Sequence, residues 1–193
     1  MTLAERLAAA LSAEPTEPLF PGDDPRGGSG ETAPAAVLIA VTDRADPGVI
    51  LTVRRDTLRT HAGQVAFPGG RIDPGESAIE AAIREAHEEL ALNPKHVTPV
   101  AELDCYRTIT NYAVTPVLAT VPPELSLSPH DREVADWFEA PLGHLLDPAN
   151  QLLRAVLFEG AERHYYEIPW QGRRIWGATA AMLVNLSRRL RWP

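Results

Sequence analysis

The sequence predicts a single domain of the mixed α/β class, for three reasons. Short apolar runs of strand length alternate with segments of helical periodicity, in the order strands, helix, strands, helix. The length of 193 residues suits one domain, and 45% apolar with 23% charged residues is ordinary for a globular chain. The net charge of −8 argues against a non-specific binder of nucleic acid or of anionic membranes, because phosphate groups attract a basic surface.

Residues 1–34 are expected to form a short helix and an arm that precede the domain. Three leucines share one face of a helix predicted over residues 2–13. Nine of the twenty residues in 15–34 are Gly or Pro, which indicates a linker or an extended arm, not a packed element. The domain itself is expected over residues 35–193. The sequence leaves open whether the helix with its Pro/Gly arm packs on the domain, lies at a dimer interface or is mobile.

The domain is expected to open with a β-hairpin. Residues 35–41 and 49–53 are apolar runs of strand length, and the turn-forming residues 43–48 join them. Residues 63–75 are rich in Gly and Pro, which predicts a shaped loop. A helix is expected over residues 77–90, because a capping box stands at its start.

The second half of the chain is predicted to supply the remaining strands and two further helices. The predicted strands are 97–103, 112–121 and 134–138, with a second hairpin of 155–158 and 164–168. The predicted helices are 142–146 and 175–190.

A single cysteine excludes an internal disulfide and a Cys-rich zinc site, which fits a reducing compartment. Cys105 is expected to be a small core residue. No apolar run approaches the length of a membrane span, and the N-terminus lacks the apolar stretch of a signal peptide. We therefore expect a cytoplasmic location.

The helix predicted over 77–90 carries an acidic face. Glu85, Glu88 and Glu89 lie within about 100° of one another on the helical wheel, opposite an apolar face. Carboxylates at this spacing repel each other, and a divalent cation would convert that repulsion into binding. Oxygen ligands of this kind suit Mg²⁺ or Mn²⁺. A bare acidic face is more often only solvated, but here Phe-Pro-Gly-Gly at 67–70 precedes it, and the two glycines permit close backbone approach.

The run from Gly70 to Leu92 resembles the Nudix box, G-x5-E-x7-R-E-U-x-E-E-x-G-U, where U is a bulky apolar residue. Its matching residues are Gly70, Glu76, Arg84, Glu85, Glu88, Glu89 and Leu92. The sequence departs from the pattern at two positions, where Ala86 is small and Ala91 replaces glycine. Alanine in a left-handed helix cap costs about 1 kcal/mol. We expect the second departure to be structural and every acid to remain functional.

The resemblance implies an α/β/α sandwich around a mixed β-sheet. It implies hydrolysis of a nucleoside diphosphate linked to another group, with Mg²⁺ or Mn²⁺ as cofactor. Glu85 and Glu89 would then be the main metal ligands, and the carbonyl of Gly69 or Gly70 would complete the site.

The resemblance also assigns catalytic roles. Glu88 would be an additional metal ligand or the base that activates water. Arg84 would orient the site, paired with Glu76. Acids outside the box are alternatives for the base, and the sequence does not choose among them. They are Glu133, Asp136 and Glu139.

The stretch before the box is similar to the signature of the coenzyme A pyrophosphatase branch, LLTxRSx3Rx3Gx3FPGG. Ile50 and Arg55 replace Leu and Ser, and the other positions match with the same gaps. Residues 175–180 also resemble the last helix of that branch. The resemblance implies cleavage of coenzyme A, or an acyl or oxidised form of it, to 3′,5′-ADP and 4′-phosphopantetheine.

A pyrophosphate with a further 3′-phosphate needs several cations in one place, and arginine suits phosphate because its planar group donates in pairs. The expected substrate-binding residues are Arg54, Arg59, Arg55, Arg71 and Gln64, with His61 in the same loop. Two other functions remain open. One is a Nudix hydrolase of a different nucleoside diphosphate derivative, such as ADP-ribose or a dinucleotide. The other is a non-catalytic scaffold that binds nucleotide. A homodimer is also left open.

Overall fold

The computed structural model describes residues 1–23, 31–55, 63–130, 133–158 and 160–190. Its main sheet has eight strands, with the central order β3-β2-β1-β7-β5. Off this path, β4 pairs with β1, β6 with β7 and β8 with β2. The strands are β1 (Ala33–Thr42), β2 (Gly48–Arg54), β3 (Val65–Ala66), β4 (Gly69–Arg71), β5 (Thr98–Glu102), β6 (Tyr106–Arg107), β7 (Tyr112–Val121) and β8 (Val134–Pro141).

The sheet is mixed because β1 and β7 run parallel over ten residue pairs, from Ala33 beside Tyr112 to Thr42 beside Val121, whereas β2 and β4 are antiparallel to β1. A second sheet has the order β11-β10-β9. Its strands are β9 (Leu152–Phe158), β10 (Ala161–Trp170) and β11 (Arg173–Trp176). The helices are α1 (Leu3–Leu11), α2 (Ala78–Leu90), α3 (Leu142–Leu146) and α4 (Ala178–Leu190).

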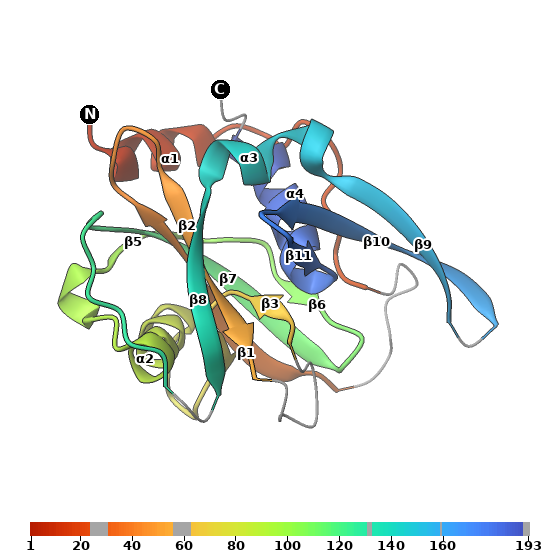
Figure 1. The fold of residues 1–193 in the computed structure, drawn as a ribbon, viewed down its shortest axis with the longest axis horizontal. Coiled ribbons are helices and arrows are strands. Elements are labelled where there is room, and N and C mark those ends of the chain that lie inside the picture. The colour runs from red at the N-terminus through yellow and green to blue at the C-terminus, as the bar shows by residue number, and fades with distance from the viewer. Residues whose placement is uncertain (24–30, 56–62, 131–132, 159, 191–193) are drawn as a thin grey trace.

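Both faces of β1 are buried, and this makes the fold a sandwich. On one face, Leu38 packs into a core with Ala82 and Ala86 of α2. On the other face, Ile39 packs into a core that includes residues of α1, α3 and α4. Figure 1 shows α2 and α4 on opposite sides of the main sheet. The predicted α/β/α fold class is confirmed. The central strand β1 is apolar from Ala33 to Val41 because helices cover both of its faces.

Most predicted elements are present, with shifted ends. The first hairpin is formed by β1 and β2. The loop at 63–75 contains the short strands β3 and β4, which we did not predict. The closing helix begins at Ala178 and not at residue 175, because Gly177 adopts a φ of 64° and residues 175–176 belong to β11.

The N-terminal segment is packed as far as it is described. Leu3 and Leu7 of α1 are buried in the core, against α4 and β5. Phe20 N–H donates to Asn185 Oδ1, and Asn185 Nδ2 donates to the Phe20 carbonyl, both at 2.9 Å. Residues 15–23 form no helix or named strand, as an extended arm would, and hydrogen bonds dock them on the domain. The proposed domain start at residue 35 stays a prediction.

Cys105 is exposed between β5 and β6, so its predicted place in the core is wrong. Residues 103–105 form an irregular connection, and Cys105 belongs to neither core cluster. No helix among the described residues is long and apolar enough to cross a membrane.

Candidate active site

Local sequence fixes both ends of α2. At its start, Ser77 N–H donates to Glu80 Oε2 at 2.8 Å and Glu80 N–H donates to Ser77 Oγ at 3.2 Å, which is the predicted capping box. At its end, Ala91 has a φ of 55°, and its N–H donates to the His87 carbonyl at 2.8 Å. Ala91 therefore occupies the left-handed position where the box has glycine. The ordered helix presents its carboxylates from one stable element.

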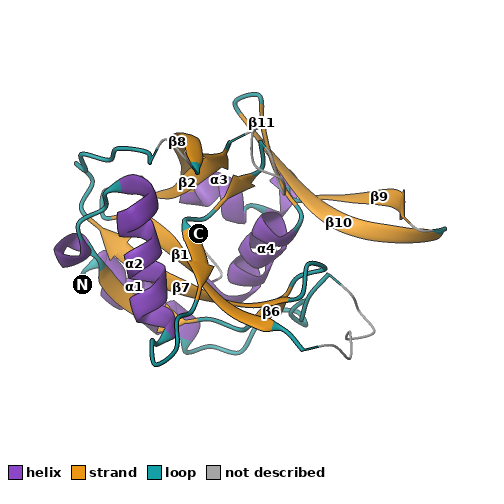
Figure 2. Cartoon of the chain, turned by 90° about the horizontal axis from the view of Figure 1, so that it is seen from below, coloured by secondary structure: helices purple, strands orange, loops and turns teal. Residues whose placement is uncertain are grey.

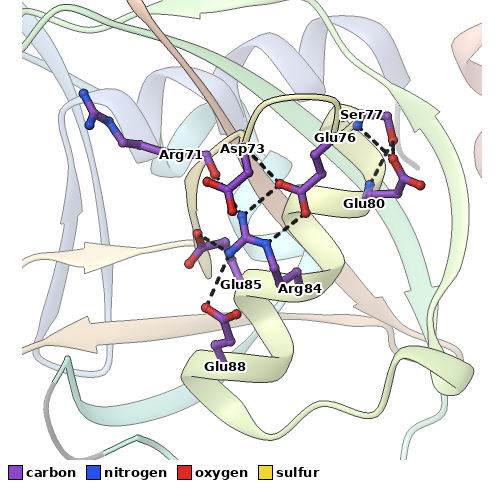
Figure 3. A network of polar contacts seen from close by, with 8 residues as sticks. All are labelled: Arg71, Asp73, Glu76, Ser77, Glu80, Arg84, Glu85 and Glu88. Carbon is purple, nitrogen blue, oxygen red and sulfur yellow. Dashed lines mark hydrogen bonds and ion pairs between the residues drawn. The ribbon is translucent and has the colours of Figure 1, made fainter.

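Arg84 joins the loop before α2 to the helix itself. Its Nε and Nη2 contact the two carboxylate oxygens of Glu76 at 2.9 and 3.0 Å, and Nη2 donates to the Arg71 carbonyl at 3.0 Å. Its Nη1 contacts Glu85 Oε1 at 2.8 Å and Glu88 Oε2 at 3.4 Å. Figure 3 shows this guanidinium at the centre of the polar network. The predicted pairing of Glu76 with Arg84 is present, and it fixes the acidic face against the loop.

Gly69 and Gly70 each leave room for a different neighbouring group. A Cβ on Gly70 would lie 2.5 Å from Glu85 Cδ, so only glycine leaves that carboxylate its position. A Cβ on Gly69 would lie 2.7 Å from Val37 Cα, inside the pairing of β4 with β1. Gly70 thus borders the acidic cluster, and Gly69 permits the strand pairing that holds it there.

Glu89 is buried, with only 5% of its surface exposed, although it lies on the helix face opposite the apolar one. Burial raises the pKa of Glu89 to about 8, and the negative charges of Glu85 and Glu133 act in the same direction. The positive charge of Arg54 and a hydrogen bond from the Gly69 backbone oppose this rise. Glu89 is therefore a buried acid that lies among other charges.

Glu85 shares this environment. Burial raises the pKa of Glu85, the contact with Arg84 opposes that rise, and the charges of Glu88 and Glu133 add to it. Glu88 is the most open of the three, with 57% of its side chain exposed. Solvent exposure of the acids therefore increases from buried Glu89 to exposed Glu88.

The donor set fits a divalent cation by its chemistry. In the described part of the chain, no three His, Cys, Asp or Glu side chains converge closely enough to mark a preformed ion site. Arg84 pairs with Glu85 and Glu88, and the positive charge of Arg54 acts on Glu89. The carboxylates still repel one another, and hard oxygen donors of this kind are what Mg²⁺ and Mn²⁺ bind. Glu85 and Glu89, with Glu88 beside them, are the residues that would hold the ion.

Arg54 is the predicted substrate residue that the structure brings to this cluster. Its Nε is buried, and in the described chain no hydrogen-bond partner lies within reach. Arg54 N–H donates to the Gln64 carbonyl at 2.9 Å, and Arg55 N–H donates to the Glu133 carbonyl at 3.1 Å. The end of β2 therefore lies between the Gln64 loop and the segment that carries Glu133.

Arg71 is a predicted substrate residue that lies away from this cluster. Arg71 is exposed, its guanidinium lies 5.9 Å from the centre of the Tyr112 ring, and in Figure 3 it extends away from Glu85. The structure does not bring this side chain to the acidic cluster. Arg59 and His61 lie outside the described residues.

Of the three acids outside the box, Glu133 lies close enough to raise the pKa of both Glu85 and Glu89. Asp136 pairs with Arg173 at 2.9 Å, and Glu139 accepts from Thr42 Oγ1 at 2.6 Å. Only the fold could separate these three, because their order in sequence says nothing about which one turns toward α2.

Comparison with known proteins identifies the family of this chain. A family model described as "NUDIX domain" matches residues 32–160. Two curated relatives bear the name "Uncharacterized Nudix hydrolase NudL". The protein of Cronobacter sakazakii is 39% identical over 157 residues, and that of Escherichia coli K12 is 39% identical over 158 residues. Each match covers 81% of this chain and 82% of the relative.

Among solved structures, the Nudix hydrolase RenU of M. smegmatis superposes with a TM-score of 0.52. It is 24% identical, and the match covers 62% of this chain and 78% of that one, so it speaks for the fold alone. The family match, the two relatives and the box geometry agree. The chain belongs to the Nudix family of hydrolases, enzymes that act on phosphoanhydride bonds.

Proposed function

We propose that this protein is a metal-dependent pyrophosphohydrolase of coenzyme A, or of an acyl or oxidised form of it. Water would attack one phosphorus of the pyrophosphate, and the anhydride P–O bond would break to give 3′,5′-ADP and 4′-phosphopantetheine. The substrate class is inferred from the arginine-containing signature at residues 50–70. The observation that carries the proposal is the buried, unpartnered Arg54 Nε beside the carboxylates of α2, in the described part of the site.

Arg54 supplies the contact that an acidic cluster alone cannot give. A buried donor without a partner is costly, and a phosphate oxygen is a suitable acceptor for it. Arg55 and Arg59 would add positive charge along the same stretch, and Gln64 would line the loop. These arginines would bind a polyanionic substrate directly, and the neighbouring acids would bind it through a metal ion.

The acids divide the remaining work. Glu85 and Glu89 would hold Mg²⁺ or Mn²⁺, which when bound neutralises pyrophosphate charge and lowers the pKa of water. Arg84 keeps Glu85 in position through its contact at 2.8 Å. Glu88 or Glu133 would accept the proton of the attacking water, since both are exposed acids whose charges act on Glu85.

The two candidate bases can be separated by paired substitutions. Loss of the base should lower turnover by a factor of about 10² to 10⁴ and remove the acid limb of the pH–rate profile. We expect this result for only one of Glu88→Gln and Glu133→Gln. Glu102→Gln, on β5 at the far edge of the sheet, is the control and should retain full turnover. If both variants keep wild-type turnover at saturating metal, neither acid is the base.

Product analysis tests the function itself. The purified protein is incubated with coenzyme A and Mg²⁺ or Mn²⁺ at mildly alkaline pH, in parallel with ADP-ribose, NADH and a dinucleoside polyphosphate. Formation of 3′,5′-ADP and phosphopantetheine, absent in Glu89→Gln, would support the proposal. Turnover of another substrate with coenzyme A untouched would refute the coenzyme A assignment. Inactivity toward every substrate would favour the nucleotide-binding scaffold.

A further inference from the structure

The hairpin of β9 and β10 extends beyond the rest of the molecule (Figure 1 and Figure 2). Three apolar side chains of β9 are exposed there: Leu153 at 57%, Val156 at 46% and Leu157 at 76%. Apolar strands are normally buried on at least one face, and clusters of exposed apolar residues mark interaction surfaces. This strand therefore has the character of an uncovered interface.

One face of the hairpin continues the core of the protein outward. On β10, Ile168 is fully buried and Tyr166 packs on the same core, with its ring 5.3 Å from that of Phe20. Residues two apart in a strand share a face, and Tyr166 lies opposite Leu153. Leu153 and Leu157 are therefore on the core-facing side, at a distance where the described chain no longer covers them.

The outer edge of β9 has little protection against pairing. It is the edge strand of its sheet, and within the described residues no strand pairs with its outer side. Proteins usually protect such edges with proline, lysine or a bulge. The sequence LLRAVLF contains none of these, and its pairing with β10 is regular throughout. Its one charge, Arg154, lies 3.6 Å from Glu167 of β10.

We propose that β9 is a dimer interface, and that two copies of this chain pair antiparallel through it about a two-fold axis at Ala155. In this register Leu153 of one copy lies opposite Leu157 of the other, twice, and the two Ala155 residues face each other. All seven residues of β9 find a partner. The two three-stranded sheets then form one continuous six-stranded sheet.

The residues of β9 favour a second copy as the occupant because the strand is complementary to itself. A two-fold axis perpendicular to the sheet allows only registers centred on a residue, since opposite residues must point to the same side. Centring at Arg154 would place two arginines opposite each other, and centring at Val156 would leave Leu153 without a partner within β9. The Ala155 register avoids both faults and covers the two most exposed leucines.

Sedimentation of the full chain over a concentration series tests the association. A seven-residue edge pairing is a small interface, so we expect a dissociation constant of about 1–100 μM. Leu157→Glu should raise that constant at least about tenfold. Ile109→Glu, which changes another exposed apolar residue at 49% exposure, should leave it unchanged. A monomer at all concentrations up to about 500 μM, or a dimer that Leu157→Glu does not weaken, would overturn the proposal.

Cross-linking tests the register in a background where Cys105 is changed to serine. Two cysteines introduced by Ala155→Cys would face each other at about 4.5–5.5 Å between Cα atoms, within reach of a disulfide. Two cysteines from Val156→Cys would lie more than about 7 Å apart, out of reach. A covalent dimer from Ala155→Cys alone is the expected result. Cross-linking of Val156→Cys and not Ala155→Cys would refute this register.

Discussion

Adding a methyl group through Gly70→Ala is expected to lower activity strongly and to lower stability only slightly. The added Cβ would lie 2.5 Å from Glu85 Cδ and 2.8 Å from Oε2. Non-bonded contacts to carbon are comfortable at about 3.5 Å, so the carboxylate would have to move by about 1 Å. That movement would also disturb the 2.8 Å contact between Glu85 and Arg84.

The expected effects on stability and on turnover differ in size. The obstructing group is the end of a side chain, which can rotate, so Gly70→Ala should destabilise the fold by only about 0.5–1.5 kcal/mol. A misplacement of about 1 Å at a catalytic group lowers turnover by about 10²-fold. We expect near-normal urea unfolding together with turnover reduced about a hundredfold and Mn²⁺ binding weakened in calorimetry.

Gly69 provides the matched control. Its added Cβ would lie 2.7 Å from Val37 Cα, which belongs to the central strand β1 and cannot rotate away. Gly69→Ala should therefore destabilise the fold by about 3 kcal/mol or more. Wild-type Mn²⁺ affinity and turnover in Gly70→Ala would refute the idea that Glu85 must keep its position. A loss of stability equal to that of Gly69→Ala would refute the idea that its carboxylate can move.

Three further predictions concern α2. Because the pKa of Glu89 is raised from 4.5 to about 8, the metal-free protein should lose stability as pH rises through this window, and thermal melts would test this. For the same reason, Mn²⁺ binding at pH 7 should release about one proton, which calorimetry in buffers of different ionisation enthalpy would measure. Both effects should vanish in Glu89→Gln. Ala91→Gly should raise Tm by about 2–4 °C, whereas Ala82→Gly inside the helix should lower it, and no gain at Ala91 would argue against a left-handed cap. Arg84→Lys cannot make the two-pronged contact with Glu76 and should lower turnover more than it alters KM, which steady-state kinetics would test.

The sequence sufficed where a local pattern decides the structure. The capping box before α2, the hairpin of β1 and β2 and the left-handed Ala91 depend on neighbouring residues alone, and all three are present. The box residues on α2 lie together because helical spacing brings them together. Their side chains could therefore be assigned to one site without knowledge of the fold.

The sequence did not suffice where distant segments meet. The short strands β3 and β4 exist only because β2 and β1 pair with them, and Gly- and Pro-rich residues carry no strand signal of their own. The wheel placed Glu89 on a polar face, but the burial that raises its pKa depends on segments outside α2. The sequence could not distinguish Glu133 from Asp136 and Glu139 as a candidate base, because only the fold brings Glu133 close to α2.

The hydrogen bonds between Phe20 and Asn185 also bear on how the chain folds during synthesis. Their partners are separated by 165 positions, so the N-terminal segment leaves the ribosome long before α4 exists. Until then Leu3 and Leu7 have no helix to pack against, and the early chain exposes apolar surface. A truncation in α4 would therefore release both ends of the protein at once, and we expect it to yield an aggregation-prone chain instead of a shorter enzyme.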